Sequence, residues 1–149
     1  MTLHARHLES GAEVGIEPDK PVRTASTIKL PIACAVAAQV AAGEARWDER
    51  LTVADASKVS VSGVLSEFSA GETISLRDAV RLMIVVSDNT ATNLVLDRIG
   101  ADVVNDHMDS LDLRRTRSMR KIRGDGTQLK AATGWSRAGL EPENQRFGI

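Results

Sequence analysis

The sequence is poor in aromatic residues and contains a single cysteine. Only 3% of its 149 residues are aromatic, and none is tyrosine. A core must therefore be built chiefly from Ala, Val, Leu and Ile, which favours helix packing. Cys34 cannot form a disulfide within the chain. Because it lies in the apolar run from Ile32 to Val36, we expect it to be a small buried hydrophobic residue.

Long hydrophobic runs and an excess of one charge are also missing. No stretch reaches the roughly 18 apolar residues of a membrane span, and Met1–His7 lacks the apolar core of a signal peptide. We therefore expect no membrane partner and no export signal in these residues, and the location stays open between export and the cytoplasm. The net charge of −1 gives no general attraction for nucleic acid.

Metal and phosphate sites have little support in the sequence. His4 and His7 lie in a predicted strand without Cys or Glu partners, so we predict no metal and no cofactor. A basic cluster near residue 120 is better explained as a solvated face balanced by neighbouring acids than as a nucleic-acid site. Its members are Arg114, Arg115, Arg117, Arg120, Lys121 and Arg123.

Local patterns predict a hairpin followed by helices. Residues 3–17 alternate in part around a Ser10-Gly11 turn, which favours two short strands. Residues 27–42 form an Ala-rich helical pattern in which Pro31 falls in the first turn and Gly43 is a left-handed stop. We predict no long element in residues 44–74. Ser75 begins a capping box, and the helices predicted after it are 76–86, 90–99 and 102–110.

A serine and a lysine lie three residues apart at the start of the first predicted helix. Ser26-Thr27-Ile28-Lys29 is an S-x-x-K motif, and residues at this spacing share one helix face. A desolvated amine can take the hydroxyl proton, and the helix N-terminus favours the developing negative charge. By itself the motif is more often a chance pattern in which serine caps a helix.

A second motif makes the first one specific. Ser87-Asp88-Asn89 follows 61 residues after Ser26 (87 − 26), at a predicted junction of two helices. Together, S-x-x-K and S-D-N resemble the class A β-lactamases and the related penicillin-binding proteins. The likeness covers roughly residues 3 to 122.

This resemblance implies an α/β (α+β) serine β-lactamase-like fold. We expect a mostly helical domain, residues 24–130, attached to an incomplete α/β domain represented by a β-hairpin and linker, residues 1–23. Residues 131–149 would form an omega-like loop. The implied substrate is a β-lactam, hydrolysed through a Ser26 ester.

The resemblance also assigns roles to individual residues. Ser26 would be the acylated nucleophile, Lys29 its proton acceptor, Ser87 a proton relay to the leaving nitrogen, and Asn89 a ligand for a substrate amide. Asp88 would be structural. Asn93 would tie its helix to the loop bearing the deacylating carboxylate, and the alternative for it is an ordinary helix-surface amide.

The deacylating carboxylate matches less closely. Leu140-Glu141-Pro142-Glu143 resembles the Glu-Pro-Glu context of the family, which makes Glu141 the candidate base and Glu143 the second candidate. Glu141 follows Asn89 by 52 residues (141 − 89), which is longer than the family pattern. A solvated loop carboxylate stays an equal alternative for Glu141.

The third family motif, K-T-G, is absent. Ala132-Thr133-Gly134 lacks the lysine and comes too early. In the family, the segment that carries K-T-G supplies one of the two oxyanion-hole amides. Losing one such donor costs on the order of 10² to 10³ in rate, so we expect little turnover from these residues alone. We also expect self-association or pairing with a missing C-terminal segment. The alternative functions are a D-alanyl-D-alanine transpeptidase or carboxypeptidase and a non-catalytic helical interaction module.

Overall fold

The structure is a computed structural model that describes residues 2–118, 121 and 122. Two strands come first, β1 (Leu3–Arg6) and β2 (Glu13–Ile16), followed by helix α1 (Lys29–Ala41). A second pair of strands, β3 (Arg50–Thr52) and β4 (Thr73–Ser75), precedes three helices. These are α2 (Leu76–Val85), α3 (Asn89–Ile99) and α4 (Ala101–Ser110). Short 3₁₀ turns occupy Ala25–Ile28, Asp55–Ser57 and Leu65–Glu67.

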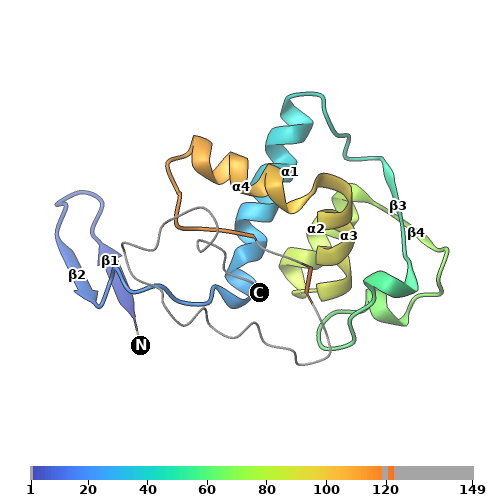
Figure 1. The fold of residues 1–149 in the computed structure, drawn as a ribbon, viewed down its shortest axis with the longest axis horizontal. Helices are drawn as coiled ribbons and strands as arrows, with labels where there is room; N and C mark the ends of the chain where they lie inside the picture. The colour runs from blue at the N-terminus through green and yellow to red at the C-terminus, as the bar shows by residue number, and fades with distance from the viewer. Residues whose placement is uncertain (1, 119–120, 123–149) are drawn as a thin grey trace.

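The predicted hairpin is confirmed. β1 and β2 are antiparallel, with Leu3 opposite Ile16 and Arg6 opposite Glu13. All eight strand residues are exposed, and the hairpin lies to one side of the helices (Figure 1). Beyond it, Asp19 accepts a hydrogen bond from Arg115 at 3.0 Å, which joins the linker to the chain after α4.

The predicted first helix is also confirmed, although α1 begins two residues later and ends one residue earlier than the predicted range 27–42. A 3₁₀ turn leads into α1 at Lys29, so Pro31 falls in its first turn, where the missing N–H costs no helical bond. Gly43 has φ +77° and ends the helix, as glycine readily does.

The expectation that Cys34 is buried was wrong. Cys34 is exposed, whereas Ile32 and Val36 on the same helix are fully buried. The reason is the helical period: a residue two positions from each of these core residues points to the opposite side of the helix. Leu30, four residues earlier on this outer face, is 60% exposed.

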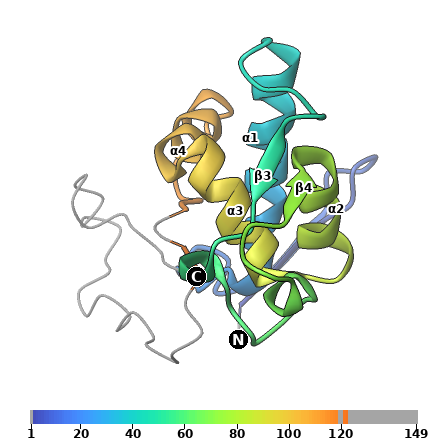
Figure 2. The same ribbon diagram turned by 90° about the vertical axis from the view of Figure 1, so that its right-hand side faces the viewer.

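Residues 44–74 contain no long element, as predicted, but they form a small sheet that the sequence did not reveal. β3 and β4 are antiparallel, with Leu51 opposite Ile74. Figure 2 places both strands beside α2 and α3, and Leu51 turns inward to join the core. The β4 residue Ser75 then caps α2, because its side chain accepts from the N–H of Asp78.

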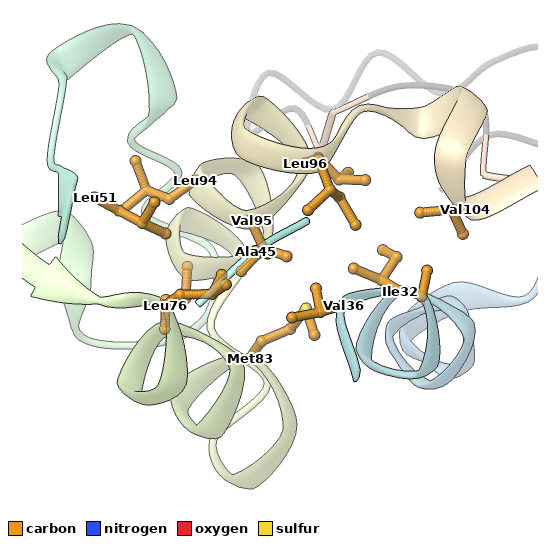
Figure 3. Close-up of a cluster of buried hydrophobic side chains, with 14 of the residues drawn as sticks. Ile32, Val36, Ala45, Leu51, Leu76, Met83, Leu94, Val95, Leu96 and Val104 are labelled. Carbon is orange, nitrogen blue, oxygen red and sulfur yellow. The ribbon is translucent and has the colours of Figure 1, made fainter. Parts of the chain in front are cut away.

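The helices share one hydrophobic core. Figure 3 shows side chains from α1, α2, α3 and α4 converging between the helices. α3 is the most enclosed helix: of its residues, Thr90 to Leu96 and Ile99 are all buried. The core includes Ile32, Val36, Leu51, Leu76, Met83, Leu94, Val95, Leu96 and Val104. Because α3 is enclosed by the other elements, its side chains can bind the segments around it.

None of the helices in the described ranges is long and apolar enough to cross a membrane. Within the same residues, no group of three or more His, Cys, Asp or Glu side chains is placed to hold a metal ion. Residues 131–149, with Glu141 and Glu143, lie outside the described part of the chain, so the domain boundaries stay predictions.

Candidate active site

Ser26 lies at the entrance to α1. It belongs to the 3₁₀ turn Ala25–Ile28, and its side chain is exposed to solvent. Ala25, directly before it, has φ +45°, a left-handed conformation that non-glycine residues rarely adopt. Such strain persists where the surroundings enforce it, and it often marks a functional position.

Lys29 is the buried charged group of the site. Only 2% of its surface is exposed. Its Nζ donates to the main-chain oxygen of Ser87 at 2.7 Å, to Ser87 Oγ at 2.8 Å and to Asn89 Oδ1 at 2.8 Å. Burial lowers the pKa of Lys29, and the nearby charge of Asp88 opposes this effect without cancelling it. Lys29 is therefore easier to deprotonate than an exposed lysine.

Ser87 connects Lys29 to Ser26. Ser87 Oγ lies 3.0 Å from Ser26 Oγ, to which it donates. Among the hydrogen bonds between described residues, none joins Lys29 Nζ directly to Ser26 Oγ. The serine and lysine predicted to meet by helical spacing are thus linked through a third side chain. Ser87 has φ +55°, so the turn between α2 and α3 holds it in a strained conformation.

Asp88 holds the backbone around the site. It is fully buried and caps α3, since Oδ1 accepts from the N–H of Ala91 at 2.8 Å. Oδ2 accepts from the N–H groups of Val64 at 2.6 Å and Leu65 at 2.8 Å. The predicted structural role agrees with this geometry, and both carboxylate oxygens are engaged.

The loop that Asp88 holds is not indicated by the sequence. Asn89 N donates to Ser62 O at 3.0 Å, which brings the loop against the start of α3. A Cβ on Gly63 would lie 2.2 Å from Asp88 Cγ, so only glycine fits there. Gly63 was the available signal, but one glycine in a serine-rich loop does not reveal its distant partner.

Asn93 is buried and binds two segments from α3. Its Nδ2 donates to Ser57 O at 3.1 Å and to Ile122 O at 3.0 Å, and its Oδ1 accepts from Ile122 N at 2.7 Å. The alternative of a helix-surface amide is wrong, because Asn93 is only 2% exposed. Ile122 precedes Glu141, the candidate deacylating base, by 19 residues (141 − 122).

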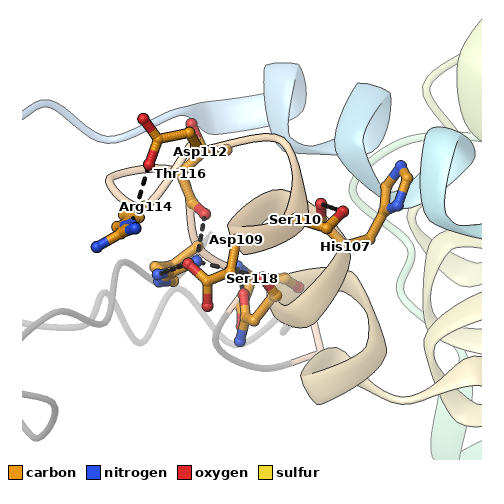
Figure 4. Close-up of polar contacts among 9 residues, drawn as sticks. His107, Asp109, Ser110, Asp112, Arg114, Thr116 and Ser118 are labelled. Carbon is orange, nitrogen blue, oxygen red and sulfur yellow. Dashed lines mark hydrogen bonds and ion pairs between the residues drawn. The ribbon is translucent and has the colours of Figure 1, made fainter.

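The described members of the basic cluster are ion-paired. Arg114 lies 3.1 Å from Asp112, and Arg115 lies 3.0 Å from Asp19. Arg117 pairs with Asp109, and Lys121 pairs with Asp97. Figure 4 shows the pair of Asp112 and Arg114 beside α4. The balance by neighbouring acids is confirmed for these four residues, but Arg117 is not on a solvated face, since only 11% of its side chain is exposed. Arg120 and Arg123 lie outside the described residues.

The predicted site residues therefore fall into three groups. The structure brings Ser26, Lys29, Ser87 and Asn89 into one hydrogen-bonded chain, with Asp88 behind them. Asn93 lies one turn further along α3. Glu141 and Glu143 lie outside the described residues. The first group can move a proton between a serine hydroxyl and an amine.

Several known proteins are similar to this chain. A model of the beta-lactamase enzyme family matches residues 1–144. The structure of a beta-lactamase from Sphaerobacter thermophilus is similar with a TM-score of 0.72 at 41% identity, over 77% of this chain and 44% of that one. The structure of PBP-A has a TM-score of 0.77 at 32% identity, over 81% of this chain and 46% of the other.

A curated relative, the beta-lactamase regulatory protein BlaB of Streptomyces cacaoi, is 33% identical over 94 residues, which are 62% of this chain and 30% of that protein. The chain thus spans less than half the length of the proteins it matches.

Proposed function

This chain belongs to the beta-lactamase enzyme family, and from that premise we propose that its described residues carry the acylation step of a serine β-lactam hydrolase. The observation that carries the proposal is the chain of hydrogen bonds from Lys29 through Ser87 to Ser26. In this proposal the β-lactam is the substrate and no metal or cofactor takes part.

The first step begins at Ser26 Oγ. The hydroxyl oxygen attacks the lactam carbonyl carbon and loses its proton toward Lys29, by way of Ser87. A lysine with a lowered pKa suits this task, because a larger fraction of it is neutral near neutral pH. The carbon–nitrogen bond of the lactam then breaks, and the leaving nitrogen takes a proton from Ser87, which is restored from Lys29. The product is a Ser26 ester with an opened ring.

Asn89 is proposed to bind an amide of the substrate. Its Oδ1 already accepts from Lys29, which fixes the side chain and leaves the Nδ2 donor for a substrate carbonyl. Asp88 would act through structure alone, since its oxygens accept three backbone N–H groups.

Hydrolysis of the ester needs a base that activates water. We propose Glu141 for this role, with Glu143 as the second candidate, from their Glu-Pro-Glu sequence alone. In the full-length protein, Glu141→Gln should slow deacylation more than acylation. Glu143→Gln tests the second candidate in the same way, and the variant that slows deacylation selectively identifies the base. Equal slowing of both steps by Glu141→Gln would remove it from the mechanism.

A second candidate function is that of a penicillin-binding D-alanyl-D-alanine transpeptidase or carboxypeptidase, which needs no such base. One observation favours it: the residue that Asn93 holds is Ile122, so the side chain at this contact is apolar and carries no carboxylate. The structure of a PBP-A mutant as an acyl-enzyme with penicillin G is among the similar proteins. A long-lived adduct would support this candidate, and hydrolysis within seconds would support the lactamase.

The decisive test is acylation of Ser26. After incubation of the full-length protein with penicillin G, mass spectrometry should show one adduct on the peptide that contains Ser26. Ser26→Ala should remove the adduct, while Thr27→Ala, at the neighbouring exposed position, should retain it. An unchanged adduct in Ser26→Ala would refute the assignment.

We also infer that the helical unit pairs with a complementary segment or a second copy. Support comes from exposed apolar side chains on two helices, Leu30 at 60% and Val85 at 78%. Purified residues 1–149 should then elute above monomer mass in size-exclusion chromatography, and turnover of a chromogenic cephalosporin by any monomeric fraction should be low. Full turnover by a monomer of residues 1–149 would contradict the inference.

A further inference from the structure

A cleft of about 320 Å³ lies between α1 and α4, away from the candidate active site. Figures 1 and 2 both place the two helices side by side. Ala38, in the α1 wall of the cleft, follows Lys29 by nine residues (38 − 29), which is about 13.5 Å along the helix axis. A volume of roughly 300 Å³ is the lower end of the range for small-molecule sites, so the cleft has room for one small molecule.

The cleft exists because the side chains that face it are small. Ala35, Ala38 and Ala42 follow one another at intervals of three and four residues, so they share one face of α1. Val103 lies on the α4 side. Side chains normally fill the space between packed helices, but the methyl groups of the three alanines are too short to do so. The floor of the cleft is therefore apolar and suits a short hydrocarbon chain.

The rim of the cleft is acidic. Glu44 follows the end of α1, and Asp106 lies on α4. No lysine or arginine is among the described residues that line the cleft. Between described residues, no hydrogen bond or ion pair engages the carboxylate of Asp106, so this group is available to a ligand. A molecule that fills the cleft therefore meets two negative charges, one from each side.

Glu44 is held in place by two other side chains. Its Oε2 accepts from Gln39 Nε2 at 2.6 Å, and its main-chain oxygen accepts from Arg98 Nη2 at 3.1 Å. The charge of Arg98 is balanced by Glu49, whose carboxylate lies 2.9 Å away. The bond from Gln39 leaves Oε1 of Glu44 as a further acceptor. A carboxylate that is already ordered binds a ligand at a smaller entropic cost than a mobile one.

Two further features of the cleft suit an ammonium group. The C-terminal end of a helix carries partial negative charge, and α1 has no basic residue in its last turn to neutralise it. Ala42 is the C-cap of α1 and lines the cleft. His107 lines it too, and Figure 4 shows this side chain projecting from α4 on the side of α1. A neutral imidazole offers one ring nitrogen that accepts an N–H.

We propose that this cleft binds a short aliphatic diamine. The hydrocarbon chain would lie on the alanine floor, and the two ammonium groups would pair with Glu44 and Asp106. An ammonium group supplies hydrogen-bond donors and no acceptor, which matches a rim that offers carboxylates and no basic side chain. The inference does not rest on acylation of Ser26, because the cleft shares no residue with the candidate active site.

The test titrates the full-length protein with 1,5-diaminopentane and follows the amide signals by NMR. At about pH 8 an ordinary imidazole is neutral and an alkylammonium is charged. The amides of Ala38, Ala42 and Asp106 should shift, and those of Ser87 and Asn89 should not. Pentylamine should bind about fivefold more weakly, because it forms one ion pair in place of two. Equal binding of the uncharged 1,5-pentanediol, or equal shifts with magnesium chloride at the same ionic strength, would overturn the inference.

Variants of the cleft locate the bound diamine. Asp106→Asn and Glu44→Gln each remove one charge, and each should weaken binding about fivefold. Asp102→Asn is the matched control, since Asp102 is exposed on α4 but does not line the cleft, and it should leave binding unchanged. Ala38→Leu should abolish binding, because the larger side chain occupies the floor. Ser26→Ala should bind the diamine as the parent protein does.

Three results would contradict the inference. Binding equal to that of the parent in both Asp106→Asn and Glu44→Gln would place the diamine outside the cleft, and loss of binding in Ser26→Ala would place it in the candidate active site. A concentration-dependent mass in size-exclusion chromatography that Ala38→Leu abolishes, without any diamine binding, would make the cleft a contact between copies. If Ala38→Leu does not fold, the two charge variants still decide the question, since both positions are exposed.

Discussion

The N-terminal hairpin and the region around α3 are stabilised in different ways. In the hairpin, every strand residue is exposed, and the two strands depend on their own ladder. Around α3, buried polar side chains bind distant segments: Asp88 holds residues 64 and 65, Thr90 holds Val59, and Asn93 holds residues 57 and 122. An isolated two-stranded unit is marginal in water, whereas satisfied buried polar groups specify one arrangement.

The site is built by the region in which side chains bind the most distant segments to one another. Ser87 and Asn89 lie at the start of α3, on either side of Asp88. The same helix that supplies them also fastens the loop at Gly63 and the chain at Ile122. Substitutions near α3 should therefore change stability far more than equivalent substitutions in the hairpin.

The largest loss of stability is expected for Asp88→Ala. It leaves the buried N–H groups of Val64, Leu65 and Ala91 without their acceptor, so the free energy of unfolding should fall by about 4 kcal/mol. Urea denaturation measures this change. Asp106→Ala, an exposed aspartate on α4, should change stability by less than about 0.5 kcal/mol. Similar losses in both variants would show that Asp88 does not hold the loop.

Gly63→Ala is expected to cost about 3 kcal/mol, because its Cβ would overlap a buried, fully bonded carboxylate. Gly43→Ala provides the matched control. Gly43 also has a positive φ, but a Cβ added there would meet nothing within 4 Å. That variant should lose only about 1 kcal/mol, from backbone strain. Thermal unfolding compares the two, and equal losses would rule out the overlap with Asp88 as the cause.

A valine-to-alanine substitution can be made both in α3 and in the hairpin, and its effect on stability should differ between them. Val95 on α3 is fully buried, and Val14 in the hairpin is 60% exposed. Val95→Ala should lower the free energy of unfolding by about 2 kcal/mol. Val14→Ala should lower it by less than about 0.5 kcal/mol. A comparable loss in Val14→Ala would show that the hairpin contributes to the same cooperative unit as α3.

The smallest expected change in stability comes from the pH dependence that Lys29 confers. Burial lowers the pKa of Lys29 below its ordinary value of 10.5. Between the lowered value and 10.5 the unfolded chain binds more protons than the folded one, so stability rises with pH through this window. Urea denaturation at several pH values up to about 10 should detect the rise. Lys29→Met keeps the length of the side chain without the charge and should remove this contribution.

Much of the fold was predictable because its signals are local. The hairpin around Ser10-Gly11, the stop at Gly43 and the cap at Ser75 each depend on a few neighbouring residues. The sheet of β3 and β4 was not predictable, since its three-residue strands are separated by 20 residues (73 − 52 − 1). Cys34 was misplaced because composition shows that a run is apolar but not which residues face the core.

The site was predictable from motif spacing, but its connections were not. Ser26, Lys29, Ser87 and Asn89 come together as the two motifs predict. The path through Ser87, in place of a direct Lys29–Ser26 contact, depends on a strained turn that no propensity indicates. The contact of the Asn105 amide with both polar backbone groups of Ser118 was not predictable either, because one asparagine in a helical pattern resembles an ordinary surface residue.

The exposure of Cys34 has a practical consequence. It is the sole thiol of the sequence, and it is open to solvent on the outer face of α1, five residues after Lys29 (34 − 29). A maleimide dye would therefore attach to the native protein at one known position, about 7.5 Å along the helix axis from the lysine. Fluorescence from that dye would follow ligand binding, or the docking of another chain on this face, without an engineered cysteine.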